Sequence, residues 1–154
     1  MEDLTFSQFN EAAGRMHKEE NGLYRRLARH FGLSDSELWI LYTLAVYQKP
    51  VTQAQMCGYL SLSKQTVNSG LKQLEQKDCI RLSSGPGRQK YLQLTARGEQ
   101  LSDRTVRLIL EAEERAFLGL AEEERARLLA LERKYLSLLH RESEQIFQSS
   151  QEES

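Results

Sequence analysis

Two short helical patterns separated by a three-residue turn constrain the fold of this chain more than any other feature. The first covers about residues 52–59 and begins with Thr52 and Gln55, which have the spacing of a capping box. The turn "SLS" follows, and the second pattern, within residues 61–76, continues to Gln76. Because so short a turn leaves the two helices in contact, the pair predicts a helix-turn-helix.

The segments around this pair complete the order of elements. A hairpin is expected after it, since "CIRLSS" and "KYLQL" have the composition of strands and the loop "GPGRQ" lies between them. A helix-turn-helix followed by a hairpin is the order of a winged helix-turn-helix, so the sequence predicts a mostly α fold with a small β-hairpin wing. The other expected helices are residues 5–31, a helix from the Ser34–Glu37 capping box to Pro50, a helix from the N-cap Thr95 to about Leu118, and residues 125–147.

Charge is distributed unevenly along a chain whose net charge is only −1. Residues 51–97 contain seven lysines and arginines against two acidic residues, a net +5, and the rest of the chain carries −6. A basic centre indicates contact with an anionic partner, whereas the acidic flanks indicate a different role. Chance clustering remains the alternative on charge alone.

The composition indicates a cytoplasmic protein. No run of eighteen apolar residues occurs, and the acidic start "MEDLTFSQFN" is unlike a secretory signal. Cys57 and Cys79 show no pairing pattern, which is typical of a reducing compartment. Both are expected to be buried core thiols rather than redox sensors.

The second helix of the pair has an unusual polar face. At about 100° per residue, its apolar stripe consists of Val67, Leu71 and Leu74. The opposite side carries amides, hydroxyls and a lysine but no carboxylate, namely Gln65, Ser69, Lys72 and Gln76, flanked by Thr66, Asn68 and Gln73. Amides and lysines pair with base edges in the major groove, whereas an acid would repel phosphate. The face therefore predicts base reading, with an ordinary solvated surface as the alternative.

Gly70 lies at the edge of the same apolar stripe. Glycine in a helix interior destabilises it by about 0.5–1 kcal/mol relative to alanine. Close approach of a neighbouring backbone is the expected compensation, and an accidental glycine is the alternative.

The stretch "SLSKQTVNSGLKQLEQKDCI", a short basic loop and "LQLTARGEQL" together resemble the MarR family of bacterial transcriptional regulators. The resemblance covers essentially the whole chain, and "LSKQTVN" and "LTARG" are its most specific parts. It implies an obligate homodimer, a wing that touches DNA, and a small aromatic or phenolic effector. It also implies one MarR-like domain over residues 1–154, with a DNA-binding lobe at 33–97, helical dimerisation segments at 1–32 and 98–148, and a disordered tail at 149–154.

The wing departs from the family pattern. Family wings commonly have an aspartate two residues before an arginine, whereas this chain has Pro86 before Arg88, so the proline ring is expected to stiffen the loop instead. Arg88 is expected in the minor groove and Lys90 near phosphate. The full set of expected DNA-binding residues is Thr52, Ser63, Lys64, Gln65, Thr66, Asn68, Ser69, Lys72, Arg88, Gln89 and Lys90.

No enzyme, metal site or cofactor is expected. The three histidines lack the i, i+4 spacing of a helical metal site, and no catalytic motif occurs. Family effectors commonly bind between the first, second and fifth helices. The candidate lining residues there are Met16, Tyr24, Trp39 and Tyr42, with ordinary core or interface packing as the alternative.

These observations predict a homodimeric repressor that binds a pseudo-palindromic operator in duplex DNA and is released by an effector. The alternative is a winged-helix protein-interaction module that does not read bases.

Overall fold

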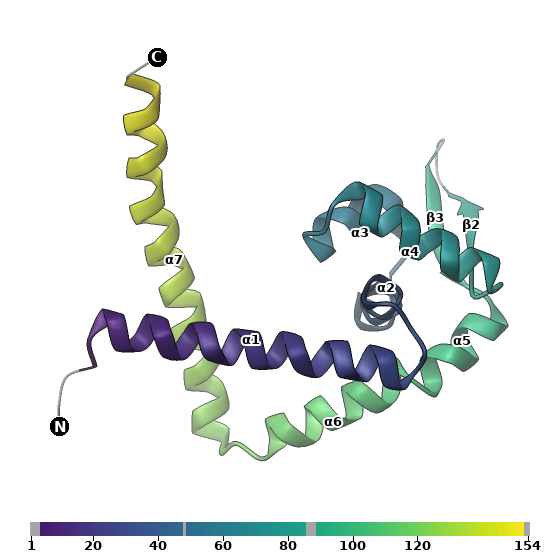
Figure 1. The fold of residues 1–154 in the computed structure, drawn as a ribbon, viewed down its shortest axis with the longest axis horizontal. Coiled ribbons are helices and arrows are strands. Elements are labelled where there is room, and N and C mark those ends of the chain that lie inside the picture. The colour runs from purple at the N-terminus through teal and green to yellow at the C-terminus, as the bar shows by residue number, and fades with distance from the viewer. Residues whose placement is uncertain (1–3, 48, 86–88, 153–154) are drawn as a thin grey trace. The chain divides into compact units, whose positions relative to one another are not determined.

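The computed structural model describes residues 4–47, 49–85 and 89–152, in which seven helices and a three-stranded sheet are formed (Figure 1). The contacts divide the chain into two compact units, Met1–Ile109 and Leu110–Ser154. In chain order the elements are α1 (Phe6–His30), α2 (Asp35–Tyr47), β1 (Val51–Thr52), α3 (Gln53–Leu60), α4 (Lys64–Gln76), β2 (Ile80–Ser84), β3 (Lys90–Leu94), α5 (Ala96–Asp103), α6 (Val106–Leu118) and α7 (Glu122–Glu152).

Helix boundaries follow local capping signals. The two capping boxes expected from the sequence are both formed: Thr52 exchanges bonds with Gln55 before α3, and Ser34 exchanges bonds with Glu37 before α2. The turn between α3 and α4 is also confirmed, with Ser61 in the left-handed region (φ 49°) and Ser63 as the N-cap of α4.

Helix α2 is the centre of the first unit. It packs against α1, α3, α4 and α5, and Figure 1 shows it nearly end-on between α1 and the layer of α3 and α4. Leu38, Ile40 and Leu41 are almost inaccessible to solvent, and Met56 of α3 and Leu74 of α4 complete the core around them. Because neighbours cover several sides of α2, the helix is apolar around much of its circumference rather than amphipathic.

The sheet contains one strand that the sequence did not predict. The expected hairpin forms from β2 and β3, which pair antiparallel with Leu82 opposite Leu92. The short β1 pairs with the other edge of β3, with Val51 also opposite Leu92, so the strand order is β1-β3-β2. Two residues carry too little local pattern to indicate a strand, and only the tertiary pairing reveals it.

The single helix expected from Thr95 to Leu118 is wrong, since the structure divides it into α5 and α6. The break lies at Thr105, whose buried hydroxyl donates to the carbonyl of Leu101 at 2.6 Å. The backbone N–H of Thr105 donates instead to Ser102 at 3.2 Å, one residue short of the α-helical partner. A threonine hydroxyl that competes for an i−4 carbonyl bends or interrupts a helix in this way.

The last helix is longer than expected. The sequence predicted a helix ending near residue 147 and a disordered tail at 149–154, whereas α7 continues to Glu152. The added residues include no proline or glycine, so no local signal ends the helix earlier. Among the described residues, no helix is both long and apolar enough to cross a membrane.

Candidate nucleic-acid interface

Helix α4 presents the polar face that the sequence predicted. Val67, Gly70, Leu71 and Leu74 are buried, and the residues between them are exposed. The exposed set includes Lys64, Gln65, Thr66, Asn68, Ser69 and Lys72, all six α4 residues expected to contact DNA. The one carboxylate of α4, Glu75, lies in its last turn. The N-terminal two-thirds of the helix therefore expose donors and acceptors without a negative charge.

The hydroxyls at the start of α4 are partly occupied by capping. The side chain of Ser63 accepts the backbone N–H of Thr66 at 3.1 Å, and the two hydroxyls lie 2.8 Å apart. In the same way, the hydroxyl of Thr52 accepts the backbone N–H of Gln55 at 3.2 Å. Ser63 and Thr52 therefore orient helix N-termini, where backbone N–H groups favour an anion such as phosphate.

Close packing explains Gly70. A Cβ built at this position would lie 2.8 Å from Cδ1 of Ile40, 2.8 Å from Oγ of Ser36 and 2.9 Å from Cβ of Ser36. The close approach expected from the sequence is present, but the expected neighbour was wrong. Side chains of α2 fill the space, not another backbone.

The C-terminal end of α4 is tied to the first turn of α2. Glu37 is buried, and one of its carboxylate oxygens accepts the ammonium of Lys77, the C-cap residue of α4, at 2.5 Å. A second link runs from the hydroxyl of Ser34 to the amide oxygen of Gln73 at 3.0 Å. Burial alone would raise the pKa of Glu37, but hydrogen bonds from Lys77 and Ser34 outweigh it and hold the pKa below its usual value.

The wing is joined firmly to α5 at its base. A Cβ on Gly98 would lie 1.8 Å from the carbonyl oxygen of Cys79, so α5 approaches the start of β2 as closely as a glycine allows. The backbone N–H of Thr95 donates to the same carbonyl at 3.0 Å, and the Thr95 hydroxyl donates to the carbonyl of Asp78 at 2.6 Å. These contacts give a physical reason for the glycine in "LTARG".

At the tip of the wing, Gln89 and Lys90 are exposed, as expected for residues that reach DNA. The amide oxygen of Gln89 accepts the hydroxyl of Tyr91 at 3.1 Å, so it is braced against the strand. Pro86 and Arg88 lie outside the described residues, and their expected roles stay predictions.

Gln53 is a residue of this surface that the sequence analysis missed. Its amide nitrogen, at the first position of α3, donates to the amide oxygen of Asn68 on α4 at 2.5 Å. The two side chains border a groove of about 340 Å³ between α4 and the sheet, which is also lined by Leu71, Lys72, Glu75, Ile80, Leu82 and Leu92. Fifteen positions separate the two amides in sequence, so no local pattern could pair them.

The region that carries this geometry matches a known family. Residues 31–89, which include α2, α3, α4 and β2, match the model of the MarR family. Over this region the chain is similar to MarR-family proteins. Solved structures that resemble the chain are those of transcription regulators.

The similarity to solved structures extends over most of the chain. MepR, a transcription regulator of the Staphylococcus aureus multidrug efflux pump MepA, is 26% identical, with a TM-score of 0.56 over 88% of this chain and 98% of that one. The S. aureus MepR–DNA complex has 24% identity and a TM-score of 0.66, covering 90% and 99% of the two chains. A MarR-family regulator from Silicibacter pomeroyi has 20% identity and a TM-score of 0.70, covering 89% and 94%. Among curated proteins, no sequence matches the chain.

Three of the four candidate effector-binding residues lie together. The rings of Tyr24 on α1 and Trp39 on α2 have centroids 4.8 Å apart, and Trp39 and Tyr42 are 5.4 Å apart. All three side chains are partly exposed. Met16 is 62% exposed and lies two helical turns before Tyr24 on α1.

The two cysteines differ in burial. Cys79 is 2% exposed, as expected for a core thiol, and burial raises its pKa above the usual value. Cys57 is only half-buried, so the expectation that it fills the core was wrong; the adjacent Met56 has that position. Within the described ranges, no three histidine, cysteine or acidic side chains gather as a metal site requires.

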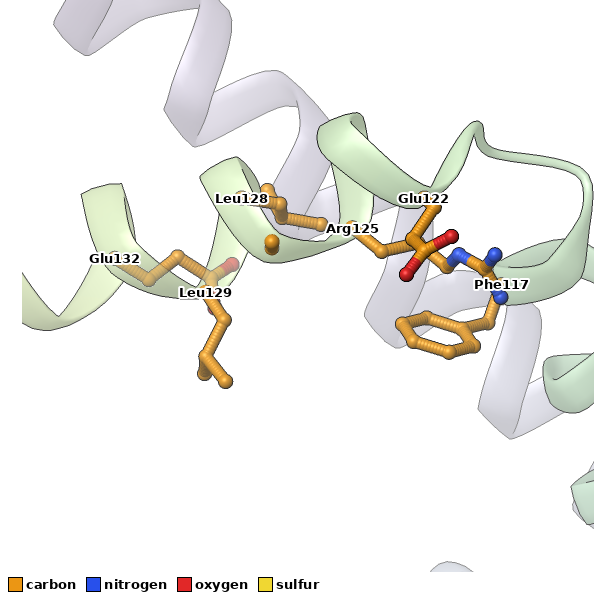
Figure 2. Close-up of a pocket in the computed structure, with 7 residues that line it drawn as sticks. Phe117, Glu122, Arg125, Leu128, Leu129 and Glu132 are labelled. Atoms are coloured by element: carbon orange, nitrogen blue, oxygen red, sulfur yellow. The ribbon is translucent and has the colours of Figure 1, made fainter.

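The second unit has an apolar hollow of its own. Figure 2 shows the side chains around this hollow of about 530 Å³, which extends from Phe117 near the end of α6 along the first turns of α7 to Glu132. Leu128 and Leu129 are among its apolar lining residues, and the guanidinium of Arg125 lies 5.2 Å from the centre of the Phe117 ring. A cation–π contact of this kind links α6 to α7.

Proposed function

We propose that the chain is a homodimeric, sequence-specific repressor that binds duplex DNA and is released by a small aromatic or phenolic effector. The main support for this proposal is the polar face of α4. The opposite face of this helix is buried in the core, and the exposed side carries Gln65, Asn68, Ser69 and Lys72. Amide and ammonium groups match the donors and acceptors of base edges in the major groove. Lys90 on the wing supplies a positive charge for the phosphate backbone.

Dimerisation is supported by apolar side chains that this chain leaves exposed. None of the α7 residues with a described side chain, 122–148, is buried. Leu128, Leu131, Tyr135 and Leu138 recur at the three- and four-residue spacing of a helix packed against another helix. A symmetric partner that covers this seam and the exposed apolar side chains of residues 5–31 would bury on the order of 2,000 Å² or more, the size of an obligate interface.

Effector release is supported by the position of the aromatic cluster. Trp39 and Tyr42 belong to α2, the helix on which α4 is seated. A planar ligand that inserts beside these rings would shift α2 and hence the recognition helix. Such a ligand lowers DNA affinity only if it binds the non-DNA-binding arrangement more tightly.

The decisive test of base reading compares two kinds of variant on an operator and on unrelated duplex DNA. The operator is sought first in the DNA upstream of the protein's own gene. We expect Gln65→Ala to lower the ratio of specific to nonspecific affinity, since one good base contact contributes about 1–3 kcal/mol of discrimination. We expect Lys90→Ala to weaken binding to both duplexes and to reduce the log–log salt slope by about 0.9 for each phosphate that the protein no longer neutralises.

If Gln65→Ala, Asn68→Ala and Ser69→Ala together leave discrimination unchanged, α4 does not read bases. The protein-interaction module would then be the better interpretation. Sedimentation of a folded monomer at micromolar concentration would contradict the dimer, because an obligate dimer has no stable folded monomer.

A further inference from the structure

Helix α4 contacts α2 at two places, and the second contact includes a buried charge. In the middle of α4, Gly70 packs against Ser36 and Ile40, and this contact is called the Gly70 seat. At the C-terminal end of α4, Lys77 forms an ion pair with Glu37. We infer that Glu37 is a positioning residue for base reading, because its tie to Lys77 sets the tilt of α4 on its Gly70 seat. This inference rests on the proposed DNA-binding function.

The carboxylate of Glu37 is fully engaged and poorly hydrated. Its side chain is 3% exposed. One oxygen accepts the backbone N–H of Ser34 at 2.8 Å, and the other accepts the ammonium of Lys77 at 2.5 Å. Glu37 therefore caps α2 and holds α4 with the same group. A solvated surface ion pair would be worth little, but a buried carboxylate with two charge-assisted bonds fixes its partner's position.

The geometry of the helix turns this tie into a control of the reading face. Seven residues separate Gly70 from Lys77, about 10 Å along the helix axis. Gln65 lies about 7.5 Å from Gly70 in the opposite direction. If α4 pivots at Gly70, a movement of about 1 Å at Lys77 shifts Gln65 by roughly 0.7 Å the other way, by the same helix geometry. Hydrogen-bond distances vary by only about 0.5 Å, so a tilt of this size disrupts base contacts.

The Ser34–Gln73 hydrogen bond at the same end of α4 does not replace the Glu37–Lys77 ion pair. Ser34 donates to Gln73 at 3.0 Å, but this bond is between exposed neutral groups. Neutral hydrogen bonds are roughly half as strong as those with a charged member. Loss of the Glu37–Lys77 pair therefore leaves α4 seated at Gly70 but weakly held at its C-terminal end.

The test is Glu37→Gln in the full-length protein. The glutamine amide oxygen can still accept the N–H of Ser34, so the cap of α2 is retained, while its NH₂ group faces the Lys77 ammonium and cannot bond to it. Lys77 is 44% exposed and is solvated once the pair is broken. The matched control is Asp35→Asn, which removes a carboxylate from the same turn of α2. This carboxylate pairs with Arg25 of α1 and not with α4.

We expect Glu37→Gln to lower the ratio of operator to nonspecific affinity by about tenfold, the discrimination of one well-made base contact. Nonspecific affinity and the salt slope should stay unchanged, because no phosphate contact is removed. Asp35→Asn should change none of these quantities. In a variant that already lacks the Gln65, Asn68 and Ser69 side chains, Glu37→Gln should have no further effect on discrimination, since nothing is left to position.

A ratio within twofold of wild type for Glu37→Gln would overturn the inference while the proposed function stands. Equal weakening on operator and unrelated DNA would also overturn it, because that result indicates a purely structural role. If Glu37→Gln does not fold, the double variant Glu37→Gln, Lys77→Ala, in which residue 77 has no side-chain group to bond with the new glutamine, takes its place with the same expected ratio. If wild-type protein shows no sequence preference, the proposed function fails, and this inference fails with it.

Discussion

Gly98→Ala should destabilise the protein strongly, because the added methyl group would collide with a backbone that is itself held in place. The new Cβ would lie 1.8 Å from the Cys79 carbonyl oxygen, whereas real Cβ atoms stay beyond 3.0 Å. Relief requires α5 and β2 to separate by more than about 1 Å. That movement stretches both bonds from Thr95, the 3.0 Å bond to Cys79 and the 2.6 Å bond to Asp78, beyond hydrogen-bonding distance.

The expected change in the free energy of unfolding follows from the loss of these two hydrogen bonds and from the higher helix propensity of alanine. Each lost hydrogen bond costs about 0.5–1.5 kcal/mol, and a buried carbonyl left unsatisfied costs about 1–3 kcal/mol. Alanine recovers about 0.5–1 kcal/mol of helix propensity. We expect a net loss of about 2–4 kcal/mol in the free energy of unfolding, measured by urea denaturation at fixed protein concentration.

Gly58→Ala is the matched control for this measurement. Gly58 lies in the interior of α3, and no atom lies within 4 Å of a Cβ built there. The same chemical change should therefore stabilise the protein by about 0.5–1 kcal/mol. If Gly98→Ala is as stable as wild type, the close contact between α5 and β2 does not exist in solution.

Two other predictions concern titration and thiol chemistry. Since the pKa of Glu37 is lower in the folded state than in the unfolded state, its contribution to stability is present above pH 4.5 and is lost as the pH falls through the folded pKa. Acid unfolding of Glu37→Gln should be less steep in that range, and an identical acid profile would show that the ion pair contributes no stability. Cys57 should react with a thiol reagent well before Cys79, because Cys79 is buried and its pKa is raised. Mass spectrometry of partially labelled protein gives the order, and early labelling of Cys79 would contradict its burial.

Features set by residues a few positions apart could be predicted from the sequence. The two capping boxes, the turn before α4 and the amphipathic pattern of α4 each depend on neighbours within one or two helical turns, and all are confirmed. The interruption at Thr105 is also local, but a lone threonine inside a helical pattern is compatible with a continuous helix. Its hydroxyl can point to solvent or to the preceding turn, and only burial selects the second.

Features set by distant residues could not be read in advance. The pairing of β1 with β3, the Gln53–Asn68 contact and the Glu37–Lys77 ion pair join segments 15 to 41 positions apart. Each needs the chain to be folded before its partners meet. Burial of Cys79 rather than Cys57 has the same origin, since the helical pattern of α3 allows either Met56 or Cys57 to turn inward.

The sequence by itself determined the helix-turn-helix, the hairpin after it and the polar side chains that α4 exposes, because periodicity and capping act over a few residues. The tertiary structure decided how α4 is held. Gly70 is seated on side chains of α2, and Lys77 is tied to a buried carboxylate forty positions before it in the chain. The physical reason is that an exposed polar face is specified by its own helix, whereas its orientation depends on the surfaces against which that helix packs.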